Sequence, residues 1–216
     1  MMKQIQRLGL IVILIHFSCK STSPVITAQT NLEKSSMMNG TTELDVWINK
    51  SLIAGIPLRA NDSLSIILAN SGMMQDTARV IRRDLNLPSP AMHFSFYRKT
   101  DGKAFSQDHS PELLRLRTAY HDNFGPGLYT EEGMVSGALS NILMVEFERG
   151  TPEARIKEIL NAHNAVKFFR WRGRVYHVEF DKGIGYDILK KAKKLFAFEE
   201  IQSVEHRTKV INSHTR

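Results

Sequence analysis

Residues 141–180 read NILMVEFERGTPEARIKEILNAHNAVKFFRWRGRVYHVEF, and residues 181–211 continue DKGIGYDILKKAKKLFAFEEIQSVEHRTKVI. Apolar side chains three and four positions apart predict one helix that begins at Thr151-Pro152-Glu153 and a second helix over 186–195. Continuous or alternating apolar residues predict strands over 141–147, 166–171, 174–180 and from 201 onward. The elements therefore follow the order strand, helix, strand, strand, helix, strand.

This order predicts an α+β domain of the ferredoxin-like βαββαβ arrangement over residues 141–211. In that arrangement, two helices cover one face of an antiparallel sheet. Apolar residues from the predicted strands and helices should share one core, and we expect it to contain Phe147, Ile156, Leu160, Val178, Leu189 and Leu195.

The same stretch resembles the fervidolysin-like N-terminal prodomain of secreted subtilisin-type serine proteases, a relative of the peptidase-inhibitor propeptides. The resemblance is carried by the first strand, the start of the first helix and the last strand, at Phe147, Gly150, Thr151, Glu153, Ile201, Val204 and Glu205. It implies a domain that helps its protease to fold and then inhibits it. Since no catalytic domain follows in this sequence, we expect a module that binds or inhibits a separate subtilisin-like protease, or the remnant of a truncated protease.

One face of the predicted sheet stays open, and it provides the candidate interface. Alternation cannot place Phe168, Phe169 and Trp171 on the same side, so at least one large aromatic residue faces away from the helices. Exposed aromatic residues near arginines are typical of interface anchors. The alternative is that residues 44–140 cover this face. The resemblance further implies that the C-terminal segment lies in the protease's cleft, so the expected interface is Phe169, Trp171, Val204, Glu205, His206, Arg207 and Lys209.

The N-terminus has the features of an export signal. Lys3 and Arg7 precede the apolar run LGLIVILIHF, which is shorter than the roughly 20 residues of a spanning helix, so residues 1–18 are predicted to be a signal peptide. The only cysteine, Cys19, follows Ser18, and this junction resembles a bacterial lipoprotein signal. We therefore expect lipid on Cys19 and anchoring to a membrane of the cell envelope. The open alternative is an ordinary signal peptide and a periplasmic or secreted protein.

The region between the signal and residue 141 shows weaker patterns. Residues 19–43 are rich in Ser, Thr, Asn and Lys and are predicted to be a tether. Residues 44–140 are predicted to be mainly strand, with a helix that begins after Ser110 and ends before a Gly-Pro-Gly turn at 125–127. Further expected features are strands at 44–48, 64–68 and 92–96, a hairpin turn at 100–103 and an interdomain linker over 133–140.

No arrangement of residues in the chain is typical of a catalytic, cofactor or metal site, so we expect no enzymatic activity, no cofactor and no metal. The run Asp108-His109-Ser110 is interpreted as the turn before a helix, because adjacent side chains cannot form a catalytic triad. His163 is interpreted as a packing residue. Gly183-Ile184-Gly185 is interpreted as a turn rather than a phosphate-binding loop.

Charge is distributed unevenly along the chain. Residues 20–140 hold twelve basic and twelve acidic residues, whereas residues 141–216 hold fifteen basic and ten. A basic βαββαβ domain suggests RNA binding, but Arg174 and Glu179 stand where stacking aromatic residues belong, so no nucleic-acid partner is expected. We expect an exported, lipid-anchored protein that binds a protease. The first alternative is a structural or assembly lipoprotein of the cell envelope, and a nucleic-acid-binding domain is the weaker one.

Overall fold

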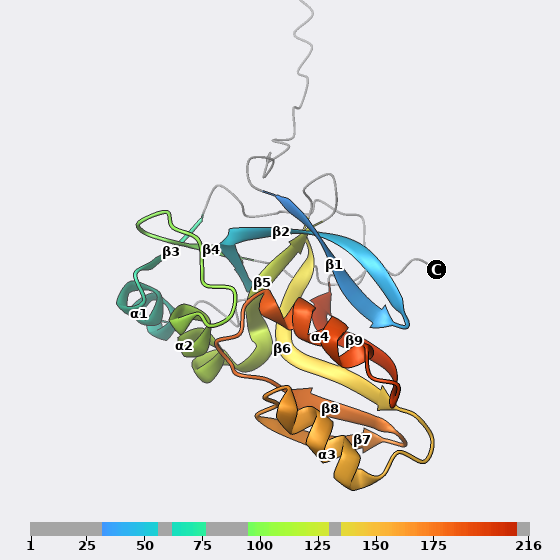
Figure 1. The fold of residues 1–216 in the computed structure, drawn as a ribbon. Coiled ribbons are helices and arrows are strands. Elements are labelled where there is room, and N and C mark those ends of the chain that lie inside the picture. Colours follow the sequence, from blue (N-terminus) through green and yellow to red (C-terminus); the bar gives the residue numbers. More distant parts are fainter. Residues whose placement is uncertain (1–31, 56–61, 77–94, 130–134, 211–216) are drawn as a thin grey trace, which may run out of the picture.

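The computed structural model describes residues 32–55, 62–76, 95–129 and 135–210 (Figure 1). The expected signal peptide and Cys19 lie outside these ranges. The described chain is a mixed α+β fold, rich in strands, with four α-helices and an antiparallel sheet. Within the described ranges, no helix is both long enough and apolar enough to cross a membrane.

Among the described residues, the strands outnumber the helices. The helices are α1 (Asp62–Asn70), α2 (Pro111–Tyr120), α3 (Glu153–Ala162) and α4 (Asp187–Phe196), with a 3-10 turn, η2 (His121–Asn123), after α2. The strands are β1 (Glu33–Gly40), β2 (Thr42–Gly55), β3 (Met73–Gln75), β4 (Ser95–Lys99), β5 (Phe124–Tyr129), β6 (Val135–Phe147), β7 (Lys167–Arg172), β8 (Val175–Glu179) and β9 (Ile201–Val210).

The C-terminal part of the sheet has the strand order β9-β6-β8-β7, and every neighbouring pair is antiparallel. Helices α3 and α4 contribute to one apolar cluster on the same side of these strands. The six expected core residues are all buried in that cluster, so this prediction is confirmed. The strands and helices predicted over 141–204 are confirmed as well, with small differences at their ends.

Strand pairing also closes a ring of five strands, β1, β2, β5, β6 and β9. Strand β2 pairs with β1 and β5, β5 pairs with β6, β6 pairs with β9, and β9 pairs with β1 through Asn39 and Glu205. Helix α4 contacts β1 and β9 of this ring (Figure 1). Strand β6 belongs both to the ring and to the β7–β8 end of the sheet, so one strand joins the two halves of the chain.

Tyr186, at the start of α4, ties the helix to the ring. Its hydroxyl donates to the carbonyl oxygen of Gly127 at 2.8 Å and accepts from the backbone N–H of Asn49 at 3.3 Å. Burial raises the pKa of Tyr186 well above its ordinary value. Because Asn49 lies in β2 and Gly127 in β5, this single hydroxyl connects the C-terminal helix to the strands that precede residue 140.

Two predictions about the organisation of the chain are therefore wrong. The predicted linker includes residues 135–140, but these belong to β6, and Ala138, Leu139 and Ser140 are buried. The predicted tether includes residues 33–43, but these form β1 and the start of β2, joined by a turn at Gly40 with φ of 68°. Strand β1 depends on backbone pairing more than on apolar side chains, which is why its polar composition suggested a tether.

Two local predictions are also wrong. Residues 64–68 lie in α1 rather than in a strand, because Leu64 and Leu68, four positions apart, are buried while Ile66 is exposed. Residues 125–127 lie in β5 rather than in a turn, and this strand is buried along its whole length. The helix after Ser110 is confirmed as α2, and the backbone N–H of Leu113 donates to the Ser110 hydroxyl at 3.3 Å.

Candidate functional site

The face of the C-terminal sheet that lies opposite α3 and α4 carries exposed aromatic side chains. Along β7, Phe168 packs against the core, whereas Phe169 and Trp171 point the other way and are 40% and 63% exposed. Strand pairing places Phe169 beside His177 of β8 and His177 beside Met144 of β6. The expectation that a large aromatic residue faces away from the helices is therefore confirmed.

Phe169, Trp171 and His177 form what we call the aromatic platform. The ring centroid of Phe169 lies 4.7 Å from that of His177 and 6.4 Å from that of Trp171. Arg207 of β9 lies beside the platform, with Nη1 3.5 Å from His177 Nε2. The neighbouring hollow has a volume of about 330 Å³ and is lined by Met144, Trp171, His177, Glu205, His206, Arg207 and Thr208. An apolar centre with a charged rim is the arrangement found at protein interfaces.

The expected interface residues divide into two groups. Phe169, Trp171, Glu205 and Arg207 are exposed, and all but Phe169 line the hollow beside the platform. The side chains of Val204 and His206 are buried, because they pair with the core positions Val145 and Leu143 of β6. His177 and Met144 were missed, since only strand pairing brings them beside the residues of β7.

The end of β9 differs from the free tail that the resemblance implied. Residues 205–210 belong to β9 and pair with β6, and Lys209 lies opposite Ala138 in this pairing. The segment is therefore part of the sheet up to residue 210, and a tail that leaves the sheet cannot begin before residue 211.

Residues from the N-terminal half lie at the other end of the open face. A hollow of about 240 Å³ is lined there by Arg117, His121, Asn141, Ile142, His177, Glu179, Lys182 and Arg207. Ile142 is buried, in contrast to Trp171 on β7. Residues 44–140 therefore reach one end of the open face and leave the aromatic platform exposed. The expectation of a free interface and the expectation of a covered face each hold in part.

The buried side chain of His206 is expected to make the folded protein less stable in acid. It is 5% exposed, and among the described residues neither ring nitrogen has a hydrogen-bond partner. Burial lowers its pKa from 6.5 to about 4. Between these values the unfolded chain binds a proton that the folded chain does not, so stability falls as pH drops from 6.5 to 4, by about 3 kcal/mol. Urea unfolding across this pH range measures the fall.

The test variant is His206→Leu, which removes the titrating group. We expect His206→Leu to flatten the acid side of the stability profile. Equal slopes in wild type and His206→Leu would contradict this assignment.

The run Asp108-His109-Ser110 has the structural role that was predicted for it. Ser110 caps α2, and its hydroxyl donates to Glu112 Oε2 at 2.7 Å. His109 Nδ1 lies 3.0 Å from Asp181 Oδ1, so His109 and Ser110 have different partners. His163 packs edge-on against Phe198, with 5.2 Å between ring centroids. Across the described ranges, no group of three or more His, Cys, Asp or Glu residues could hold a metal ion.

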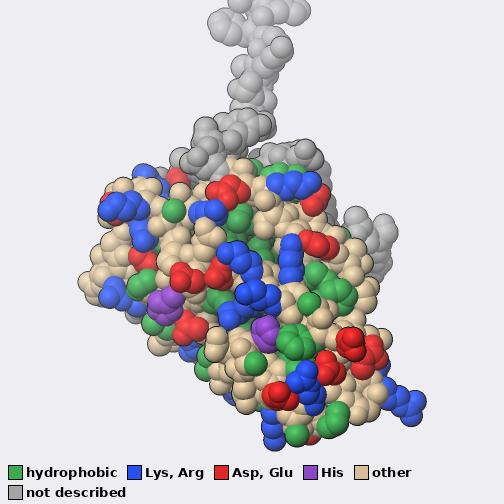
Figure 2. Space-filling model, in the orientation of Figure 1, with side chains coloured by type: hydrophobic (Ala, Val, Ile, Leu, Met, Phe, Trp, Pro, Cys, Tyr) green, Lys and Arg blue, Asp and Glu red, His purple; other side chains and the backbone are tan. Residues whose placement is uncertain are grey.

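Basic side chains gather over α4 (Figure 2). Several of them already have partners within the chain. Lys190 pairs with Asp187 at 2.9 Å, Lys193 pairs with Glu43, and Lys191 donates to the carbonyl oxygen of His163 at 3.1 Å. These contacts support the interpretation of the α4 lysines as a solvated helix face.

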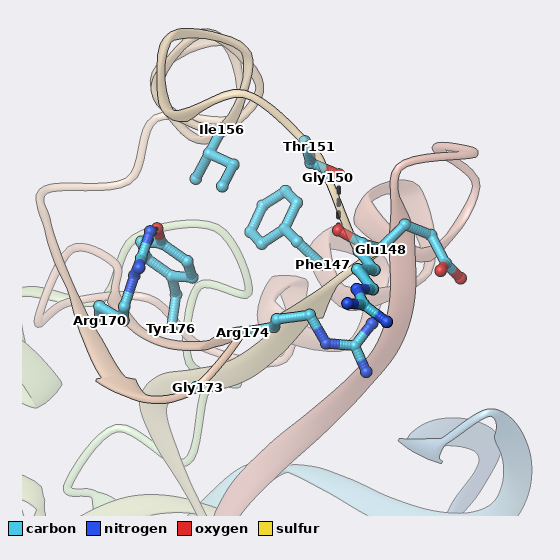
Figure 3. Close-up of a pocket in the computed structure, with 10 residues that line it drawn as sticks. Phe147, Glu148, Gly150, Thr151, Ile156, Arg170, Gly173, Arg174 and Tyr176 are labelled. Carbon is cyan, nitrogen blue, oxygen red and sulfur yellow. Dashed lines mark hydrogen bonds between the residues drawn. The ribbon is translucent and has the colours of Figure 1, made fainter.

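A second hollow lies on the other side of the sheet, and we call it the arginine cleft (Figure 3). Its volume is about 570 Å³. Arg149 comes from the loop after β6, Arg170 from β7, and Arg174 from the β7–β8 turn. The other lining residues are Phe147, Glu148, Gly150, Thr151, Ile156, Gly173 and Tyr176.

Comparison of the chain with protein-family models, curated proteins and solved structures returns no match. The aromatic platform and the arginine cleft are therefore the features of the described chain that bear on its function.

Proposed function

We propose that this protein is a non-catalytic binding module and that the aromatic platform is its docking surface for a partner protein. The observation that carries the proposal is Trp171, which is 63% exposed beside Phe169 and His177. Water is expelled from a large apolar surface when such a side chain enters a partner's pocket, and tryptophan and arginine are enriched at the centres of interfaces. Arg207 and Glu205 supply charges at the rim.

The proposed partner is a subtilisin-type serine protease. Two observations support this class besides the resemblance of residues 141–211 to protease prodomains. The element order β6-α3-β7-β8-α4-β9 and the strand order β9-β6-β8-β7 support the ferredoxin-like arrangement that the resemblance implies. The open face is also accessible at β7, which leaves room for an enzyme to pack against the sheet. Glu179 and Glu205 on the open face disfavour a nucleic-acid partner, because carboxylates repel phosphate.

The proposed location is the cell envelope, with a lipid on Cys19 as the membrane anchor. This proposal rests on the sequence of residues 1–19 alone. A membrane-anchored inhibitor would act on proteases that are released from, or that approach, the same membrane. A structural lipoprotein of the envelope is the alternative, and it would use the same face without affecting a protease.

The test is to titrate the full chain into purified subtilisin-type proteases and follow peptide hydrolysis. The full chain is required because β6 is shared by both halves. We expect inhibition at micromolar concentrations, weakened about 30-fold in Trp171→Ala, as for a central anchor residue. Ile66→Ala is the matched control, since Ile66 on α1 is 58% exposed and lies away from the platform.

Two results would contradict the proposal, and they do so at different points. If several such proteases are not inhibited, the protease is wrong as the partner class. If Trp171→Ala inhibits as strongly as Ile66→Ala and wild type, the aromatic platform is wrong as the docking surface.

A further inference from the structure

We propose that the arginine cleft is a binding site for an oxyanion, the phosphate or carboxylate group of a small molecule. Three arginines line one hollow, one from the loop after β6 and two from the β7–β8 hairpin. Each guanidinium group carries five N–H donors in a planar fork that matches two oxygens of a phosphate or a carboxylate. The volume of about 570 Å³ is that of a small-molecule site.

Internal contacts hold two of these arginines in place without using all their donors. Arg170 donates from Nη2 to Glu153 Oε2 at 3.0 Å and to the Tyr176 hydroxyl at 2.9 Å. Arg174 donates from Nη2 to Glu146 Oε1 at 3.0 Å. The remaining N–H groups of both side chains stay available, so a ligand would meet guanidinium groups that are already oriented.

The third arginine of the cleft is not paired within the described part of the chain. Arg149 is exposed, and no described residue forms an ion pair or hydrogen bond with its guanidinium group. Glu148 is the carboxylate among the lining residues, and Figure 3 shows it turned away from the other labelled side chains. The acids that touch the cleft arginines, Glu146 and Glu153, are each engaged with one of them. Arg149 therefore lacks a counterion that an anionic ligand would supply.

The cleft is open on one side and apolar on another. Gly150 and Gly173 have φ values of 94° and 56°, and no heavy atom lies within 4 Å of the place where a Cβ would stand. Phe147, Ile156 and Tyr176 form the apolar wall beneath them. A small molecule with an anionic group and an apolar part fits this combination of surfaces.

This inference is independent of the proposed function. Successive side chains along a strand point to opposite faces, so Arg170 lies on the opposite side of β7 from Phe169 and Trp171. A ligand in the cleft would leave the aromatic platform free.

The test is to titrate the full chain with inorganic phosphate and with citrate by isothermal calorimetry, with sodium chloride matched for ionic strength. We expect a dissociation constant of about 1 mM or tighter for at least one anion. The anion that binds more tightly identifies the group, phosphate or carboxylate. Binding should weaken as sodium chloride is added, because salt screens exposed charges.

Arg149→Gln and Arg174→Gln are each expected to weaken anion binding about tenfold, since each removes one charge-assisted contact. Arg172→Gln is the matched control, because Arg172 is also exposed at the β7–β8 turn and does not line the cleft. Arg149→Gln breaks no contact within the described chain, so its melting temperature should match wild type. Absence of binding by both anions, or equal binding by all three variants, would overturn the proposal.

Discussion

Arg117→Met is expected to destabilise the protein by about 3–5 kcal/mol, a large part of the free energy of unfolding of an ordinary domain. Arg117 lies on α2 and is 1% exposed. It donates to four backbone carbonyl oxygens, at 2.7 to 2.9 Å, which belong to Phe124, Leu139, Lys182 and Ile184. These carbonyls come from β5, β6 and the loop before α4, so one side chain joins three segments of the fold.

Methionine keeps the apolar stem of arginine but has no N–H donor, so the substitution leaves the carbonyl oxygens buried without their partner. Lysine tests the geometry separately, because its single ammonium group cannot reach the same four oxygens. We expect Arg117→Lys to lose most of the same free energy. Urea unfolding monitored by circular dichroism measures both.

Arg115→Met is the matched control for this prediction. Arg115 lies on the same helix and is exposed, where it donates to the carbonyl oxygen of Asn70 at 2.7 Å. Its replacement should cost less than about 1 kcal/mol, as for most surface positions. If Arg117→Met were as stable as Arg115→Met, the carbonyl contacts of Arg117 would not be what holds the three segments together.

Gly125→Ala is expected to cost more than about 3 kcal/mol, at the upper end of the cost of overpacking a core. A Cβ at this position would lie 1.8 Å from the carbonyl oxygen of Leu139 and 3.1 Å from Arg117 Nη2. The first contact is with backbone, which cannot rotate away as a flexible side chain can. Strands β5 and β6 would have to separate, and the five-strand ring would open at this pair.

The control for Gly125→Ala is Gly102→Ala. No atom lies within 4 Å of the Gly102 Cβ position, but its φ of 72° is unfavourable for alanine. We expect a cost of about 1 kcal/mol there. Thermal unfolding of the two variants compares a backbone collision with conformational strain, and equal costs would show that β5 and β6 are not in close contact at Gly125.

Local patterns identified most of the C-terminal elements. Ile156, Ile159 and Leu160 repeat at helical spacing and are buried, and the strands over 174–180 and from 201 alternate in the printed sequence. Such patterns depend on which side of one element faces the core, and a residue's near neighbours in sequence carry that information. Alternation along β7 likewise predicted that at least one of Phe168, Phe169 and Trp171 faces away from the helices.

The same reasoning failed where near neighbours were uninformative. The five residues 64–68 fit both a strand and a helix, and the burial of Leu64 and Leu68 against other elements selects the helix. Met38 is the one buried residue of β1, so no apolar pattern marks this strand. The Gly-Pro-Gly run of β5 is typical of a turn in the sequence. In the structure it is a strand, and β6 packs so closely against it that Gly125 has no room for a side chain.

The sequence alone was sufficient for the order of elements after residue 140, for the buried sides of α3 and α4, and for the presence of a large aromatic residue on the open face, because these follow from spacing along one segment. The closure of the ring, the burial of Arg117 and the meeting of Arg149, Arg170 and Arg174 required the folded chain. In the sequence, an arginine on a helix is typical of a surface position. Arg117 is buried because carbonyl oxygens from three other segments surround it in the folded chain.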